Sequence, residues 1–231
     1  MSNAASVAHD EHQHHPRLAH HFESLEQQTE SSLLGMWIFL ATEILFFGGA
    51  LMAYMVYRRW YPDAFALASS HIAILPGAIN TAVLIFSSLT MALAVHAAQT
   101  GERTKILFFI VITMILGAAF LGIKAYEYHE KYLEGFIPGL GLEFRFPEPQ
   151  YATNAQIFFS IYFVLTGLHA LHMIVGLGLM TWMFIWVKKG VIDTQYFAPI
   201  EIVGLYWHFV DIVWIFLFPL LYLIGRHIHH G

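Results

Sequence analysis

Residues 106–125 of this chain read ILFFIVITMILGAAFLGIKA, and Lys124 is the only charged residue in the run. A helix rises about 1.5 Å per residue, so about 20 apolar residues cross the ~30 Å hydrocarbon core of a bilayer. A helix also satisfies its own backbone hydrogen bonds, which lipid cannot do. The run therefore predicts a transmembrane helix.

Four other stretches are long and apolar enough for the same role. The five predicted spans are residues 33–57, 75–98, 106–125, 155–187 and 200–225. The fourth exceeds the length required, so it tilts or projects into water. In composition, 58% of residues are hydrophobic and 12% are charged, against roughly 25% charged in a soluble domain. The predicted fold class is all-α, a polytopic transmembrane bundle of five helices.

The sequence divides into three parts. Residues 1–30 form a polar, histidine-rich N-terminal segment, residues 31–226 the transmembrane domain, and residues 227–231 a short histidine-rich tail. The first part lacks the apolar core of a cleavable signal peptide. Histidine-rich tracts bind transition metals weakly, but disordered termini are the simpler interpretation. Inside the domain, glycines and prolines between Glu127 and Gln150 predict one long loop.

Charge gives a weak prediction of orientation. Five spans place the termini on opposite sides, with five lysines and arginines on the N-terminal side and six on the other. The two short loops on the N-terminal side are cationic, however, while the long loop is acidic, which favours a cytoplasmic N-terminus. Lys188 and Lys189, in one of these cationic loops, are the candidates for contact with lipid headgroups.

The residue inventory excludes several functions. The chain has no cysteine, so disulfides, thiolate metal sites and iron–sulfur clusters are excluded. It shows no nucleophile with a base, no phosphate loop and no paired-carboxylate site. No basic stripe predicts nucleic-acid binding. We therefore predict no catalytic residue, no bound metal and no nucleic-acid partner for this chain.

Glu43 lies about ten residues into the first span, about 15 Å deep and near the bilayer midplane. An acidic side chain at that depth costs on the order of 3 kcal/mol or more if it faces lipid. It must therefore face protein, water or a polar partner. Two interpretations stay open: a proton-linked carboxylate or subunit contact, and a protonated glutamate bonded to a helix backbone.

Polar residues also mark one face of the fifth span. His208 and Asp211 lie one turn apart, and Trp207 shares their face. An i,i+3 imidazole–carboxylate bond would satisfy both polar groups. Contact between helices is one interpretation of this face, and a proton relay is the other.

The third and fourth spans carry polar pairs with the same i,i+3 spacing. Lys124 and Glu127 are predicted to pair at the membrane edge. His169 and His172 lie beside small and hydroxyl residues that indicate close helix packing. A metal site would need further ligands. A b-type haem would need a histidine from a facing helix, and His208 is the only other histidine well inside a span.

Four segments, taken together, resemble subunit III of the haem–copper respiratory oxidases, a family named for cytochrome c oxidase. The matching segments are residues 35–43 with Phe46-Phe47-Gly48, 121–131, 166–172 and 206–214, the last reading YWHFVDIVW. They extend over the whole predicted membrane part. The family commonly has seven helices; this chain lacks the first two and resembles the five-helix bacterial forms.

The resemblance implies a function that the spacings alone do not. Subunit III holds no haem or copper; it packs on subunit I, beside subunit II, binds phospholipid and supports proton uptake. The family's buried glutamate maps onto Glu43. The complex reduces oxygen to water and pumps protons across the bacterial inner membrane. We therefore expect a non-catalytic subunit of a cytochrome c oxidase, with haem and copper in its partners, structural phospholipid, a cytoplasmic N-terminus and a periplasmic C-terminus.

Several alternatives remain. The chain could be subunit III of a quinol oxidase or an accessory homologue of nitric oxide reductase. Glu43 favours cytochrome c, because some quinol-linked relatives carry aspartate there. Outside this family, a haem-binding membrane anchor would use His169 or His172 opposite His208. A proton-coupled transporter would use Glu43 and Asp211.

Overall fold

The computed structural model describes residues 19, 22–139, 144–194 and 196–223. Its elements are α1 (Leu25–Trp60), α2 (Pro62–Ser70), α3 (Ile74–Gln99), α4 (Arg103–Glu134), the 3-10 turn η1 (Pro149–Tyr151), α5 (Ala152–Lys188), α6 (Ala198–Phe218) and the π-helical turn η2 (Pro219–Leu223). Within these residues, five helices are long and apolar enough to cross a membrane. The predicted class, an all-α bundle with five spans, is confirmed.

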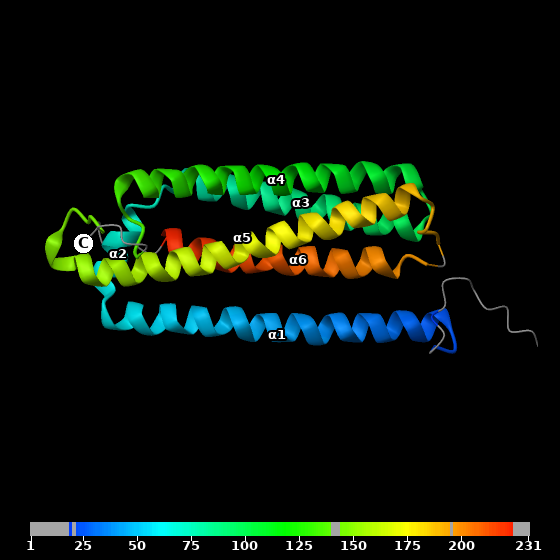
Figure 1. The fold of residues 1–231 in the computed structure, drawn as a ribbon, viewed down its shortest axis with the longest axis horizontal. Coiled ribbons are helices and arrows are strands. Elements are labelled where there is room, and N and C mark those ends of the chain that lie inside the picture. The colour runs from blue at the N-terminus through cyan, green and yellow to red at the C-terminus, as the bar shows by residue number, and fades with distance from the viewer. Residues whose placement is uncertain (1–18, 20–21, 140–143, 195, 224–231) are drawn as a thin grey trace, which may run out of the picture.

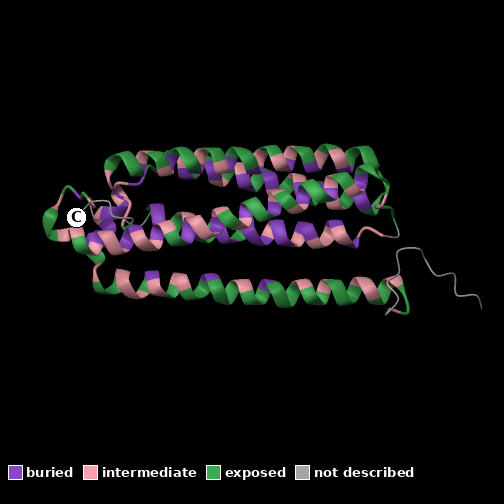
Figure 2. Ribbon diagram, viewed as in Figure 1, coloured by how far each residue is buried: buried purple, intermediate pink, exposed green. Residues whose placement is uncertain are grey.

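Helices α3 to α6 pack together, and α1 runs along one side of them, against α5 and α6 (Figure 1). Burial follows this arrangement (Figure 2). In the most apolar stretch of α6, 50% of residues are buried inside the protein, against 17% for α1. Helix α6 is therefore the central helix of the bundle, and α1 is peripheral.

Two helices are longer than predicted. Helix α1 begins at Leu25 instead of residue 33, because the Ser24 side chain caps it by accepting a hydrogen bond from the Gln27 N–H at 3.1 Å. Helix α4 continues to Glu134 and ends at Gly135, whose φ of +77° is the left-handed C-cap conformation. The predicted loop beginning at Glu127 is therefore wrong at its start: Glu127 lies in α4.

A short helix, α2, was not predicted. It begins at Pro62, a residue suited to a first helical turn, and it packs on α5. The Ser69 hydroxyl donates to the Leu221 carbonyl at 2.8 Å, and the Tyr54 hydroxyl donates to the Leu220 carbonyl. These bonds hold η2 at the end of the bundle. Residues 224–225 of the predicted fifth span, most of the N-terminal segment and the C-terminal histidine tail lie outside the described residues.

Trp207 fixes the spacing of three helices at the centre of the bundle. It is fully buried, and its Nε1 donates to Ser87 Oγ at 2.7 Å. A Cβ placed on Gly117 would lie 2.7 Å from the indole ring, and one on Gly176 would lie 2.8 Å from it. Only glycine therefore lets α4 and α5 approach this ring so closely.

We predict that Gly176→Ala destabilises the protein, because the added methyl meets a ring that is enclosed on all sides. Overpacking of this kind costs about 1–3 kcal/mol. Gly178→Ala is the matched control, since a Cβ there meets nothing within 4 Å. The measurement is the thermal midpoint of the purified protein in detergent. Equal midpoints for the two variants would contradict the packing role of Gly176.

Candidate functional site

Glu43 of α1 and His172 of α5 form a polar contact between the peripheral helix and the bundle. His172 Nε2 lies 3.1 Å from Glu43 Oε2, and the two side chains are 13% and 18% exposed. The other ring nitrogen, Nδ1, lies 2.9 Å from the Leu168 carbonyl oxygen. A carbonyl can only accept a hydrogen bond, so Nδ1 carries a proton.

The tautomer of His172 determines whether a proton lies between Nε2 and the Glu43 carboxyl group. With Nδ1 protonated, one further proton lies between Nε2 and Oε2. It is held by the carboxyl group beside a neutral imidazole, or by the imidazolium beside a carboxylate. Both forms have a net charge of zero, which suits a site inside a membrane. The pair therefore shares one proton without a change in total charge.

Aromatic rings fix the position of His172. Its ring lies 5.2 Å from the Phe47 ring and 6.4 Å from the Tyr206 ring, centroid to centroid. The Tyr206 hydroxyl donates to the His172 carbonyl at 3.0 Å. The i,i+3 spacing of His172 and His169 did not predict the contact of His172 with Glu43. The contact could have been predicted from depth in the membrane, because Glu43 and His172 both lie near the middle of their predicted spans.

The predicted bond between His208 and Asp211 is wrong. His208 Nδ1 lies 2.8 Å from Ser88 Oγ of α3 instead. Neither carboxyl oxygen of Asp211 has a hydrogen-bond partner among the described residues. Residues three apart differ by about 60° around a helix axis. Here Asp211 points into the bundle with Trp207 and Trp214 while His208 reaches sideways to α3.

His169 does not join His172 in a common site. Its ring is buried against the rings of Phe120, at 5.3 Å, and Trp214, at 5.2 Å. Neither ring nitrogen has a hydrogen-bond partner in the described part of the chain. The described residues also contain no group of three or more His, Cys, Asp or Glu that could hold a metal ion. His169 is a polar side chain enclosed by aromatic rings.

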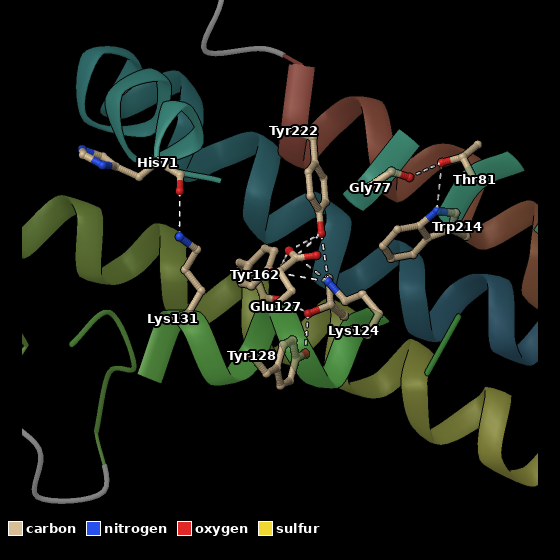
Figure 3. Close-up of polar contacts among 11 residues, drawn as sticks. His71, Gly77, Thr81, Lys124, Glu127, Tyr128, Lys131, Tyr162, Trp214 and Tyr222 are labelled. Carbon is tan, nitrogen blue, oxygen red and sulfur yellow. Dashed lines mark hydrogen bonds and ion pairs between the residues drawn. The ribbon is translucent and has the colours of Figure 1, made fainter. Parts of the chain in front are cut away.

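Lys124 and Glu127 form the core of a buried polar cluster (Figure 3). Lys124 Nζ lies 3.3 Å from Glu127 Oε1 and donates to the hydroxyls of Tyr162, at 3.0 Å, and Tyr222, at 2.8 Å. Both hydroxyls donate to Glu127 Oε1, that of Tyr222 at 2.6 Å. The pair is present as predicted, and with exposures of 3% and 1% it is enclosed by protein.

The lysines near the two ends of the bundle differ in accessibility. Lys131 is buried and donates to the His71 carbonyl and to Glu134. Lys188 and Lys189 are exposed at the end of α5. The Arg103 guanidinium donates to the Lys188 carbonyl, so the α3–α4 and α5–α6 connections meet at this end.

The geometry supports proton sharing and helix packing. The Glu43–His172 pair is hydrogen-bonded and partly exposed, whereas the Lys124 cluster is closed and satisfied on most of its atoms. Within the described residues, no hydroxyl is activated by a histidine–carboxylate pair.

Comparisons with known proteins agree with the segments quoted above. Residues 139–226 match the family model described as cytochrome c oxidase subunit III. The chain is 32% identical over 204 residues to quinol oxidase subunit 3 of Bacillus subtilis (strain 168), covering 87% of this chain and 92% of that protein. It is 30% identical over 213 residues to a probable quinol oxidase subunit 3 of Staphylococcus aureus (strain USA300), covering 90% and 98%. The chain therefore belongs to the subunit III family of the haem–copper oxidases.

Proposed function

We propose that this chain is the non-catalytic subunit III of a bacterial, proton-translocating cytochrome c oxidase. It packs on subunit I, within a complex that includes subunit II, binds membrane phospholipid and supports proton uptake during the reduction of oxygen to water. The observation that carries this proposal is the proton-sharing pair of Glu43 and His172, which is partly exposed at mid-membrane depth. A polar pair in that position requires a partner surface, water or ordered lipid over it.

Haem and copper belong to the partner subunits in this proposal. His169 and His172 do not suit a haem ligand, because the rings of Phe120 and Trp214 enclose His169 and both nitrogens of His172 have partners. This geometry does not favour a haem-binding anchor. A transporter would use Glu43 and Asp211 together, but they share no hydrogen-bond partner among the described residues.

The orientation proposed is N-terminus in the cytoplasm and C-terminus in the periplasm of the bacterial inner membrane. The bond from Arg103 to Lys188 brings two cationic connections together at the end of the bundle where α1 begins (Figure 1). At the opposite end, Lys124 and Lys131 are buried and paired with acids. Arg59 and Arg145 are exposed at that end, so the proposed orientation depends on the two short cationic connections of the N-terminal side, which favour a cytoplasmic position.

The electron donor has two candidates. Cytochrome c is the first, as the glutamate at position 43 suggests. Quinol is the second, because the B. subtilis relative is a quinol oxidase subunit and the S. aureus relative a probable one, each similar over most of its length. The other subunits of the complex bind the donor, so a functional measurement on the complex decides between them.

We predict that purification in mild detergent recovers this chain with a large haem-bearing subunit. Mass spectrometry of the co-purifying chains and an optical spectrum of the complex are the measurements. Oxygen consumption with reduced cytochrome c, compared with consumption with a quinol, then assigns the donor. A chain that purifies alone, or that holds haem without any partner, would contradict the proposal.

We predict that Glu43→Gln leaves assembly intact but slows proton uptake or shortens the turnover lifetime of the oxidase. Glutamine keeps a hydrogen bond to His172 but cannot exchange the shared proton. Glu30→Gln, at an exposed position of the same helix, is the control. Proton-uptake kinetics and loss of activity over successive turnovers are the measurements. If both variants match the wild type, Glu43 serves packing alone.

An apolar groove between α1 and α6 supports the lipid-binding part of the proposal. Its volume is about 510 Å³, and its walls include Trp37, Leu51, Phe209 and Phe216. From Trp37 to Leu51 it is about 21 Å long at ~1.5 Å per residue, longer than one ~15 Å leaflet. The residues that line it are almost all apolar, so the groove suits an acyl chain.

The groove continues into a more polar recess at the N-terminal end of α1. The recess shares Trp37, Leu205 and His208 with the groove, and Glu201 also lines it. An amphiphile with its headgroup at this end would keep its acyl chain in the apolar part. Lys188 and Lys189, exposed at the same end, remain the candidates for contact with lipid phosphates.

We predict that Gly48→Leu displaces a tightly bound phospholipid from the complex. Gly48 lines the groove, and a Cβ there meets nothing within 4 Å, so the larger side chain fills the space without a clash. Gly49→Leu is the matched control, because Gly49 has equal space but does not line the groove. Native mass spectrometry counts the retained phospholipids. Equal numbers of retained phospholipids in both variants would contradict lipid binding in the groove.

A further inference from the structure

Four side chains inside the bundle carry buried polar atoms that have no hydrogen-bond partner among the described residues. They are Asn80 of α3, Glu127 of α4, His169 of α5 and Asp211 of α6, one from each helix of the bundle. Each side chain is at most 2% exposed. The unpaired atoms are both amide atoms of Asn80, both ring nitrogens of His169, both carboxyl oxygens of Asp211 and Oε2 of Glu127.

Trp214 is the common neighbour of these residues. Its ring lies 5.2 Å from the His169 ring and 5.3 Å from Lys124 Nζ, the partner of Glu127. Its Nε1 donates to the hydroxyl of Thr81, the residue next to Asn80, at 3.1 Å (Figure 3). Asp211 precedes Trp214 by just under one helical turn. The unpaired groups therefore belong to side chains that contact Trp214 or lie within about one helical turn of residues that do.

The energetics require partners for these atoms. Burying a polar group without a hydrogen bond is strongly unfavourable, and lipid around the bundle offers no replacement. In folded proteins such groups are almost always paired, and where side chains do not pair them, ordered water does. Several unpaired atoms around one side chain, Trp214, indicate a shared set of bound molecules.

The chemistry of the groups favours water over a metal ion. The Asn80 amide nitrogen only donates, and a neutral imidazole both donates and accepts. A metal ion cannot accept a hydrogen bond from the amide, whereas water donates and accepts. The described residues also contain no metal-ligating group of three.

We infer that the bundle of α3 to α6 encloses ordered water molecules beside Trp214, which bridge Asn80, His169 and Asp211. At one end Ser88, which bonds His208, lies beside the Asp211 carboxyl group but outside the geometry of a direct hydrogen bond. At the other end the water reaches the Lys124–Glu127–Tyr222 cluster. From His208 to Tyr222 the polar file extends about 21 Å along the helix, roughly two thirds of the ~30 Å hydrocarbon core. It is separate from the Glu43–His172 pair, which lies between α1 and α5, and goes beyond the proposed function.

The test is a cryo-electron microscopy map of the intact complex, at a resolution where water is visible elsewhere in its membrane-embedded part. We expect solvent peaks within about 2.7–3.2 Å of Asp211, His169 and Asn80 atoms. Direct side-chain hydrogen bonds among these residues, or an empty space beside Trp214, would overturn the inference.

A pair of variants gives a second measurement. Asp211→Leu should remove the solvent peaks beside position 211, because the carboxyl group that holds the water is gone. Ile215→Leu, an exposed position of the same helix, should retain them. If Asp211→Leu does not assemble, Asn80→Leu replaces it, and the solvent peaks beside position 80 should then be lost. Peaks that persist unchanged without their polar partner would count against bridging water.

Discussion

Lys124 and Glu127 bring opposite charges into a region where water does not compete for them, and the rest of that end of the bundle is arranged around this pair. An isolated charge there would be strongly unfavourable, and even a buried ion pair loses more hydration than it gains unless further hydrogen bonds complete it. Tyr162 and Tyr222 supply those bonds. Through them, the pair holds α4, α5 and η2 together.

The polar groups of the bundle differ in how much of each side chain is exposed. We use this difference to distinguish structural from proposed functional roles. The Lys124 cluster is sealed, so its protons have no route of exchange through the surface nearby. Glu43 and His172 make one hydrogen bond with each other and stay partly exposed. A side chain that exchanges protons with a partner needs that exposure, and a side chain that holds helices together is better without it.

The sequence predicted what depends on one helix at a time. Apolar runs longer than a bilayer is thick revealed all five spans. The i,i+3 spacing revealed the Lys124–Glu127 pair, but the same spacing failed for His208 and Asp211, because His208 bonds Ser88 of another helix. The sequence missed the contacts of His172 with Glu43 and of His208 with Ser88, since these depend on the register between helices. Helix α2 was missed because nine residues bounded by aromatics and a proline also fit a loop.

The attachment of α1 explains why its one acidic residue at depth matters. The buried residues of α1 are Leu40, Phe47 and Tyr54, spaced by seven, so a single narrow seam joins this helix to the bundle. Glu43 lies one turn from Leu40 on this side, and its bond to His172 is a polar contact in an otherwise largely aromatic seam. A helix held by so little buried surface is the element most sensitive to the state of that bond. The Glu43–His172 contact is therefore also a determinant of how α1 sits on the bundle.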